Sequence, residues 1–134
     1  GMSSYLIIGV AVVGGLMALM VVLNMTIAWR MAAQQGKPLP AIPGPVGERL
    51  AQAKRGLVYF FSPGCAACVR LTPKFKTMSE QNHDVHVVDV SQDFGVARAL
   101  KVLATPSTVE VANGYIVGVH IGPVPQDVLA RYAA

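Results

Sequence analysis

The sequence predicts a small α/β domain, with helices packed on a mixed β-sheet, behind one long apolar helix. The 134 residues include 11 Lys and Arg and 7 Asp and Glu, and none of these charges precedes Arg30. From Glu48 onward, short apolar runs alternate with helical stretches, the order expected of an α/β domain. The dipeptide Asn113-Gly114 predicts a two-residue hairpin near the end. We therefore divide the chain into an apolar anchor (1–30), a Pro/Gly-rich linker (31–47) and a folded domain (48–134).

The first part is predicted to be a transmembrane helix. No charged side chain interrupts Tyr5 to Trp29, and Tyr5 and Trp29 stand at the two ends, where aromatic rings favour the headgroup region. A helix of that length spans about 37 Å, more than the roughly 30 Å hydrocarbon core. The segment is longer than the apolar region of a cleaved signal peptide, and no basic residue precedes it. We therefore expect a retained, single-pass anchor.

The linker and the domain differ in composition. Residues 34–47 hold four prolines and three glycines, which predicts a semi-extended spacer between membrane and domain. Beyond it we expect an αβαβαββα order: helix 48–55, strand 57–61, helix 65–81, strand 85–90, helix 95–102, strands 108–111 and 115–120, and helix 126–132.

The two cysteines of the chain, Cys65 and Cys68, stand at C-x-x-C spacing where a buried strand turns into a helix. In a βαβ unit this placement indicates redox chemistry. The first helical turn favours negative charge, so we expect the Cys65 thiolate to be stabilised there. Cys68 lies on the same helix face, within disulfide reach, and is placed to resolve a mixed disulfide formed at Cys65.

The residues from about Leu57 to Gly122 resemble the thioredoxin family. The run LVYFFSPGCAAC stands where that family has its strand, turn and active-site motif, and Pro73 matches its helix-kinking proline. VVDVSQD resembles the central strand and the turn after it, and Thr105-Pro106 matches the cis-proline site. The resemblance implies a thioredoxin-like sandwich of about four strands, since the linker occupies the place of the family's first strand.

The same resemblance implies residue roles and partners. Cys65 would be the nucleophile, Cys68 the resolving thiol and Pro106 the cis-proline. The backbone of Thr105 would pair with a substrate peptide, and Gly122 would let that substrate approach. The partners implied are protein substrates with disulfides or thiols, together with a membrane or soluble electron donor. No cofactor is implied besides the Cys65–Cys68 disulfide itself.

Several positions depart from the family pattern. Gly64 replaces the tryptophan that usually precedes the first cysteine, which leaves the lip of the site bare. Ala66 and Ala67 replace Gly-Pro between the cysteines. Tyr59 falls where the family has a buried aspartate, and Val87 where it has a strand lysine, so the proton relay is altered. With no histidine between the cysteines, we expect a reductant rather than a strong oxidant.

Three other interpretations compete with the redox one. The two cysteines could form a static disulfide, or they could bind zinc together with His83 and His86, whose spacing approaches a zinc pattern. The fold could also serve as a tethered, non-catalytic scaffold. Nucleic-acid binding is not expected despite the net charge of +4, because the basic residues are scattered and not interleaved with aromatic ones.

The location of the domain rests on two opposed arguments. Arg30 and Lys37 follow the span, and the positive-inside rule would place the domain in the cytoplasm. The resemblance to tethered bacterial thioredoxins favours the periplasmic side of an inner membrane, where protein disulfides persist. We expect the periplasmic location.

Overall fold

The computed structural model describes residues 1–133 and divides the chain into two compact units, Gly1–Arg30 and a second unit that begins at Met31. The first unit is helical and belongs to α1 (Met2–Ala32), whose side chains are exposed up to Thr26. Within the described residues, α1 is the one helix long and apolar enough to cross a membrane.

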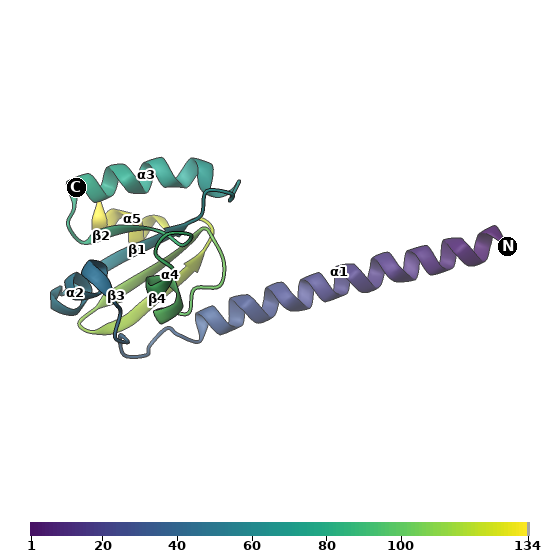
Figure 1. Ribbon diagram of the computed structural model, residues 1–134, viewed down its shortest axis with the longest axis horizontal. Helices are drawn as coiled ribbons and strands as arrows, with labels where there is room; N and C mark the ends of the chain where they lie inside the picture. The colour runs from purple at the N-terminus through teal and green to yellow at the C-terminus, as the bar shows by residue number, and fades with distance from the viewer. Residues whose placement is uncertain (134) are drawn as a thin grey trace. The chain divides into compact units, whose positions relative to one another are not determined.

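The second unit is built on a four-stranded mixed sheet, as predicted (Figure 1). Its strands are β1 (Arg55–Phe61), β2 (Val85–Asp89), β3 (Ser107–Ala112) and β4 (Tyr115–Ile121), in the order β2-β1-β3-β4. β1 pairs parallel with β2 and antiparallel with β3, which pairs antiparallel with β4. The last pair is joined by the predicted hairpin, in which Asn113 and Gly114 both have positive φ.

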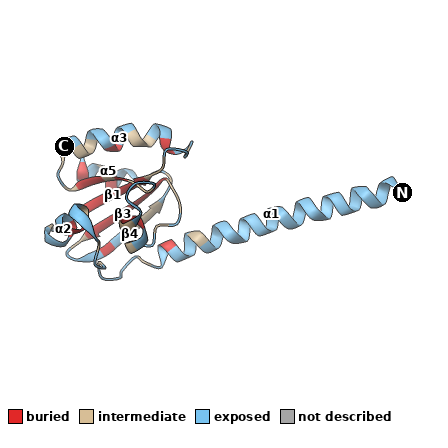
Figure 2. Cartoon of the chain, viewed as in Figure 1, coloured by how far each residue is buried: buried red, intermediate tan, exposed pale blue. Residues whose placement is uncertain are grey.

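Two helices cover each face of the sheet. On one face, α2 (Gly44–Gln52) and α4 (Phe94–Ala99) contribute Leu50 and Val96 to a core with Val58 and Phe60 of β1. On the other, α3 (Cys68–Gln81) and α5 (Gln126–Tyr132) contribute Phe75 and Tyr132 to a core with Tyr59. Figure 2 shows the burial concentrated in the sheet between these helices. β1 is central and alternates its side chains between the two cores, which is why its residues from Gly56 to Phe60 are all buried.

The boundaries of several elements differ from the sequence predictions. The helix expected over 48–55 is α2, which begins at Gly44, and residue 55 already belongs to β1. Pro45 lies in the first turn of α2, where a missing N–H removes no helical bond, so the linker prolines permit the earlier start. The helix expected over 95–102 is the shorter α4.

The Pro/Gly-rich segment before α2 lies along β4 rather than running as an unpaired spacer. Three backbone hydrogen bonds join them: Gly36 N–H to Ile116 O (2.6 Å), Ile116 N–H to Lys37 O (2.9 Å) and Leu39 N–H to Gly114 O (2.8 Å). Pro38 forms an isolated antiparallel bridge with Tyr115. Leu39 and Ile42 also pack against the core. The segment therefore caps the β4 edge of the sheet.

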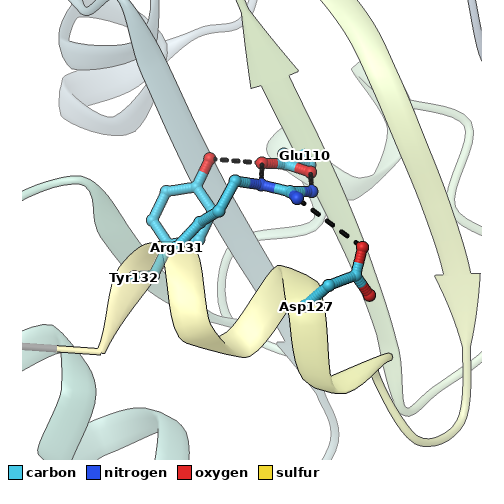
Figure 3. A network of polar contacts seen from close by, with 4 residues as sticks. All are labelled: Glu110, Asp127, Arg131 and Tyr132. Carbon is cyan, nitrogen blue, oxygen red and sulfur yellow. Dashed lines mark hydrogen bonds and ion pairs between the residues drawn. The ribbon is translucent and has the colours of Figure 1, made fainter.

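A buried carboxylate fixes the last helix to the sheet (Figure 3). Glu110 of β3 accepts two hydrogen bonds from Arg131, at 3.1 and 2.7 Å, and one from the Tyr132 hydroxyl at 2.8 Å. Burial by itself raises the pKa of Glu110, but the bonds from Arg131 and Tyr132 outweigh burial and hold the pKa below its usual value. The carboxylate is thus ionised and fully paired within the domain.

Candidate functional site

The two cysteines form a disulfide at the N-terminal end of α3. Their Cα atoms are 5.3 Å apart, within the range that a disulfide needs. The sequence predicted a helix that begins at Cys65, but α3 begins at Cys68. Cys65 lies in the turn just before the helix. Cys68 is 2% exposed, whereas Cys65 is only half-buried. Of the two cysteines, Cys65 is the one that solvent and a partner can reach.

The turn before α3 is held by its own backbone. The N–H of Cys65 donates to the carbonyl of Ser62 (3.1 Å), and the N–H of Cys68 donates to the carbonyl of Cys65 (3.2 Å). Cys65 therefore lies directly ahead of the first turn of a 14-residue helix. The positive end of the helix dipole stabilises negative charge at this place, so a thiolate is favoured.

The loop before β3 is hydrogen-bonded to the same turn. The hydroxyls of Ser62 and Thr105 are 3.3 Å apart, and the peptide bond between Thr105 and Pro106 is cis. The carbonyl of Pro106 in turn accepts a hydrogen bond from Gly122 N–H at 2.8 Å. A chain of hydrogen bonds thus links the turn of Cys65 with Thr105, Pro106 and Gly122.

Two glycines border this arrangement for different reasons. A Cβ at Gly64 would meet no atom within 4 Å, and the backbone there is not left-handed. A Cβ therefore has room at Gly64, and the lip beside Cys65 is open. Gly122 has φ +79, a conformation that strains other residues. Its Cβ position also faces open space, so a partner backbone has room there.

Below the cysteines, Tyr59 is buried and contacts two aromatic rings and one hydroxyl group. Its ring stacks on Phe75 with the ring centroids 4.3 Å apart, and a second ring, Phe61, lies at 6.1 Å. Its hydroxyl lies 2.8 Å from the hydroxyl of Thr72, which follows Cys68 by one turn of α3. Burial raises the pKa of Tyr59, and the bond with Thr72 only partly opposes this. The phenol is therefore neutral at physiological pH.

The comparisons with known proteins agree with this geometry. The sequence model of the thioredoxin family matches residues 47–134, about two thirds of the chain. The chain belongs to the thioredoxin family. No curated protein sequence matches it.

Solved thioredoxin structures share the fold. The reduced thioredoxin pre-protein of Schistosoma mansoni is 30% identical, with a TM-score of 0.54 over 66% of this chain and 88% of that one. A second structure of thioredoxin from that organism gives 30% identity and a TM-score of 0.55, over 66% and 85%. Oxidised mitochondrial thioredoxin 3 of Saccharomyces cerevisiae, 23% identical with a TM-score of 0.51 over 63% and 82%, shows the fold alone.

A thioredoxin domain whose cysteine pair lies at disulfide distance is a thiol–disulfide oxidoreductase. Two features of this thioredoxin were not anticipated from sequence. Thr72, the partner of Tyr59, gave no signal because its contact depends on how α3 packs on β1. A hollow of about 220 Å³ also opens beside Thr105, lined by apolar residues that include Val90, Phe94 and Leu103.

Pro73 lies inside α3 of this thioredoxin, as predicted. Because proline has no N–H, it cannot donate to the carbonyl four residues earlier, that of Val69. Val69 directly follows Cys68 and is 69% exposed. Near the site, the helix therefore has a carbonyl without its usual intrahelical donor.

The zinc interpretation does not fit this arrangement. The cysteines are joined to each other at the start of α3, whereas His83 and His86 come after its end. A 14-residue helix is about 20 Å long, which separates the two pairs. Among residues 1–133, no group of three or more His, Cys, Asp or Glu residues could hold a metal ion.

Proposed function

We propose that the protein is a membrane-anchored thioredoxin that reduces disulfides of protein substrates. The observation that carries this proposal is the unequal exposure of the cysteine pair at the start of α3: Cys65 is accessible and Cys68 is buried behind it. This arrangement suits a two-step exchange in which one sulfur meets the substrate and the other releases it.

The exchange starts from the reduced pair. The Cys65 thiolate attacks one sulfur of the substrate disulfide, which forms a mixed disulfide and expels the other substrate sulfur as a thiolate. The Cys68 thiolate then attacks Cys65 Sγ, forms the Cys65–Cys68 disulfide and expels the second substrate sulfur. Two electrons pass to the substrate, and two protons complete its thiols. A dithiol donor, in the membrane or in solution, then reduces the pair again and takes the oxidising equivalents.

The surrounding residues are proposed to hold the substrate and shape the site. The backbone of Thr105, next to cis-Pro106, would pair with the substrate chain beside its disulfide. The open space at Gly64 and Gly122 would let that chain approach Cys65. Tyr59 and Pro73 would support the helix that carries the cysteines.

The direction of transfer is proposed from what surrounds Cys65. No histidine lies between the cysteines, and the residues there are Ala66 and Ala67. The N-terminal end of α3 is therefore the main source of thiolate stabilisation. Strongly oxidising dithiol proteins need a thiolate that is stabilised further. We expect a reduction potential close to the −270 mV or so of reducing thioredoxins, rather than the roughly −120 mV of strongly oxidising dithiol proteins.

The anchor is proposed to be α1, in a bacterial inner membrane, with the domain in the periplasm. The apolar helix supports anchoring, and the persistence of protein disulfides outside the cytoplasm supports the orientation. A membrane-impermeant maleimide tests this in intact cells after mild reduction. Labelling of Cys65 from outside the inner membrane is expected, whereas labelling only after lysis would place the domain in the cytoplasm.

A turnover assay tests the catalytic proposal. The full chain, reconstituted in lipid vesicles, is supplied with dithiothreitol and insulin, and reduction of the insulin disulfides is followed by turbidity. We expect catalysis that Cys65→Ser abolishes, with Ser79→Ala on the far half of α3 as the unaffected control. Equal inactivity of the wild type and Cys65→Ser would instead favour the non-catalytic scaffold, for which the changes at Gly64 and Tyr59 give some support.

A further inference from the structure

The outer edge of β2 carries backbone groups that its own sheet does not use. β2 is an edge strand, with β1 on one side and no strand on the other among the described residues. Backbone groups alternate in direction along a strand, and the bond from Leu57 N–H to Asp84 O (2.8 Å) fixes which residues face β1. The even-numbered residues face β1, so Val85, Val87 and Asp89 turn their N–H and C=O groups outward.

Two of these six outward groups are satisfied by neighbouring turns. Val85 N–H donates to Asn82 O (3.2 Å), and Asp89 O accepts from the N–H groups of Gln92 (3.1 Å) and Asp93 (2.8 Å). Within residues 1–133, four outward groups remain without a backbone partner: Val85 O, Val87 N–H, Val87 O and Asp89 N–H. They are centred on Val87, and such a row is a template for another strand.

A hollow lies beside each end of β2. At the start of β2, a hollow of about 400 Å³ is lined by residues that include Arg49, His83 and Asp84. At its end, a hollow of about 480 Å³ is lined by residues that include Lys76 of α3 and Val46 of α2. The second hollow is therefore bordered by helices from both faces of the sheet.

We propose that β2 pairs antiparallel with β2 of a second copy of this chain, about a two-fold axis at Val87. In that register Val87 lies opposite Val87 of the second copy, and Asp89 lies opposite Val85 of the second copy. The two Val87 residues exchange two hydrogen bonds, and each Asp89 N–H donates to Val85 O across the axis. Every one of the four unused groups on each copy gains a partner, while the two already satisfied groups need none.

The charges beside the edge also favour a second copy over an unrelated strand. The hollow at the start of β2 holds one cation, Arg49, and one carboxylate, Asp84. The hollow at its end has an acidic excess, with Asp89 and Asp93 against the single cation Lys76. The two-fold axis brings the end hollow of each copy opposite the start hollow of the other, so the acidic excess faces Arg49 and not the acidic excess of the second copy.

Cross-linking at the axis tests the proposal. Val87→Cys is introduced into the full chain with Cys65→Ala and Cys68→Ala, in lipid vesicles, and oxidised with copper phenanthroline. Cα atoms of a hydrogen-bonded antiparallel pair lie about 5.5 Å apart, within disulfide reach. Val117→Cys, in the opposite edge strand β4, is the matched control because Val117 is 43% exposed and collides with other copies at least as readily. We expect at least tenfold more disulfide dimer from position 87, and equal or absent cross-linking at 87 would overturn the proposal.

A second variant tests the edge without new cysteines. Val87→Lys places a charge at the axis, where two copies would meet like charges, and Val117→Lys is its control. Because Val87 also packs against the core, the variant is compared only if its circular dichroism and urea unfolding show a folded domain. The molecular mass of the detergent-solubilised full chain is measured. We expect a dimer for the wild type and for Val117→Lys, and a monomer for Val87→Lys. A monomeric wild type, a dimer that survives Val87→Lys, or binding of a different extended protein at this edge in place of a second copy would each overturn the proposal. Neither test depends on the thiol chemistry, so the proposed reductase activity stands or falls separately.

Discussion

The hydroxyl of Tyr59 lies 2.8 Å from that of Thr72, which follows Cys68 by one turn of α3. Related thioredoxins are expected to have a buried aspartate at the position of Tyr59. Here a neutral phenol, stacked on Phe75, fills that place and ends in a hydroxyl pair. A phenol whose pKa lies above its usual value cannot accept a proton near neutral pH. The site therefore lacks the titrating group that a buried acid would provide.

We expect the pH dependence of substrate release to reflect the cysteines alone. Tyr59→Phe keeps the ring and removes only the hydroxyl, so the pH profile of the release step should keep its shape. Tyr59→Asp should add an inflection, since a buried carboxyl titrates above its usual pKa. Acid-quench trapping of the mixed disulfide with a disulfide peptide, between pH 5 and 9, measures the release step in both variants. A profile that loses an inflection in Tyr59→Phe would show that the phenol does take part in proton transfer.

Two threonines beside Tyr59 should respond in opposite ways to the same substitution. Thr108 is opposite Tyr59 in the β-sheet register, and its hydroxyl is buried without a hydrogen-bond partner among the described residues. Thr108→Val removes that unpaired hydroxyl and should raise the free energy of unfolding by up to about 1 kcal/mol. Thr72→Val breaks the bond to Tyr59 and should lower it by about 0.5–1.5 kcal/mol. Urea unfolding measures both, and a destabilised Thr108→Val would reveal a partner for that hydroxyl.

The paired carboxylate of Glu110 should make the domain sensitive to acid. Its pKa is held below the usual value of about 4.3, so its stabilising contribution is complete above that pH and is lost as the pH falls through the folded value. Glu110→Gln should lower the free energy of unfolding at pH 7 by about 1–3 kcal/mol and flatten its decline between about pH 5 and 3.

Asp127→Asn is the control for that experiment. Its carboxylate lies 3.6 Å from Arg131, but its side chain is 76% exposed, so its removal should change little. Urea unfolding at several pH values separates the two variants. If Glu110→Gln loses stability in acid as steeply as the wild type, other groups and not Glu110 cause the acid sensitivity.

The order of attack proposed for the cysteines predicts a trapped intermediate. Cys68→Ser keeps Cys65, the proposed nucleophile, but removes the sulfur proposed to resolve the mixed disulfide. Incubation with a disulfide substrate should then give a covalent adduct through Cys65, visible on a non-reducing gel and removed by dithiothreitol. Cys65→Ser should give no adduct, since Cys68 is 2% exposed. An adduct in Cys65→Ser and none in Cys68→Ser would reverse the two roles.

Local patterns were sufficient for most of the fold. The apolar run of β1 gave a strand buried on both faces, and Asn113-Gly114 gave the hairpin, because each depends on residues close in sequence. The cysteine pair was found for the same reason. Helix ends were less certain, since Pro45 is compatible both with a linker and with the first turn of α2.

Contacts between distant segments were not predictable in this way. The bond between Tyr59 and Thr72 depends on the packing of α3 on β1, and Glu110 meets Arg131 only when α5 folds back on β3. The course of the proline-rich segment is a further case. Its composition is that of a spacer, but prolines are also tolerated on the edge of a sheet. Whether the segment stays free or pairs with the sheet depends on the available edge of β4, which is distant in sequence.

The docking of that segment predicts slow hydrogen exchange where a spacer would exchange freely. The N–H groups of Gly36, Leu39 and Ile116 all donate across the contact with β4. In the full chain, we expect these three amides to exchange at least tenfold more slowly than that of Ala41, for which the structure gives no backbone bond. Leu39→Ala removes a side chain that packs against the core, so it should speed exchange at all three sites without affecting β1. Exchange at Gly36 and Leu39 as fast as in an unfolded peptide would restore the flexible spacer, because an amide that is hydrogen-bonded in the folded domain must open before it exchanges.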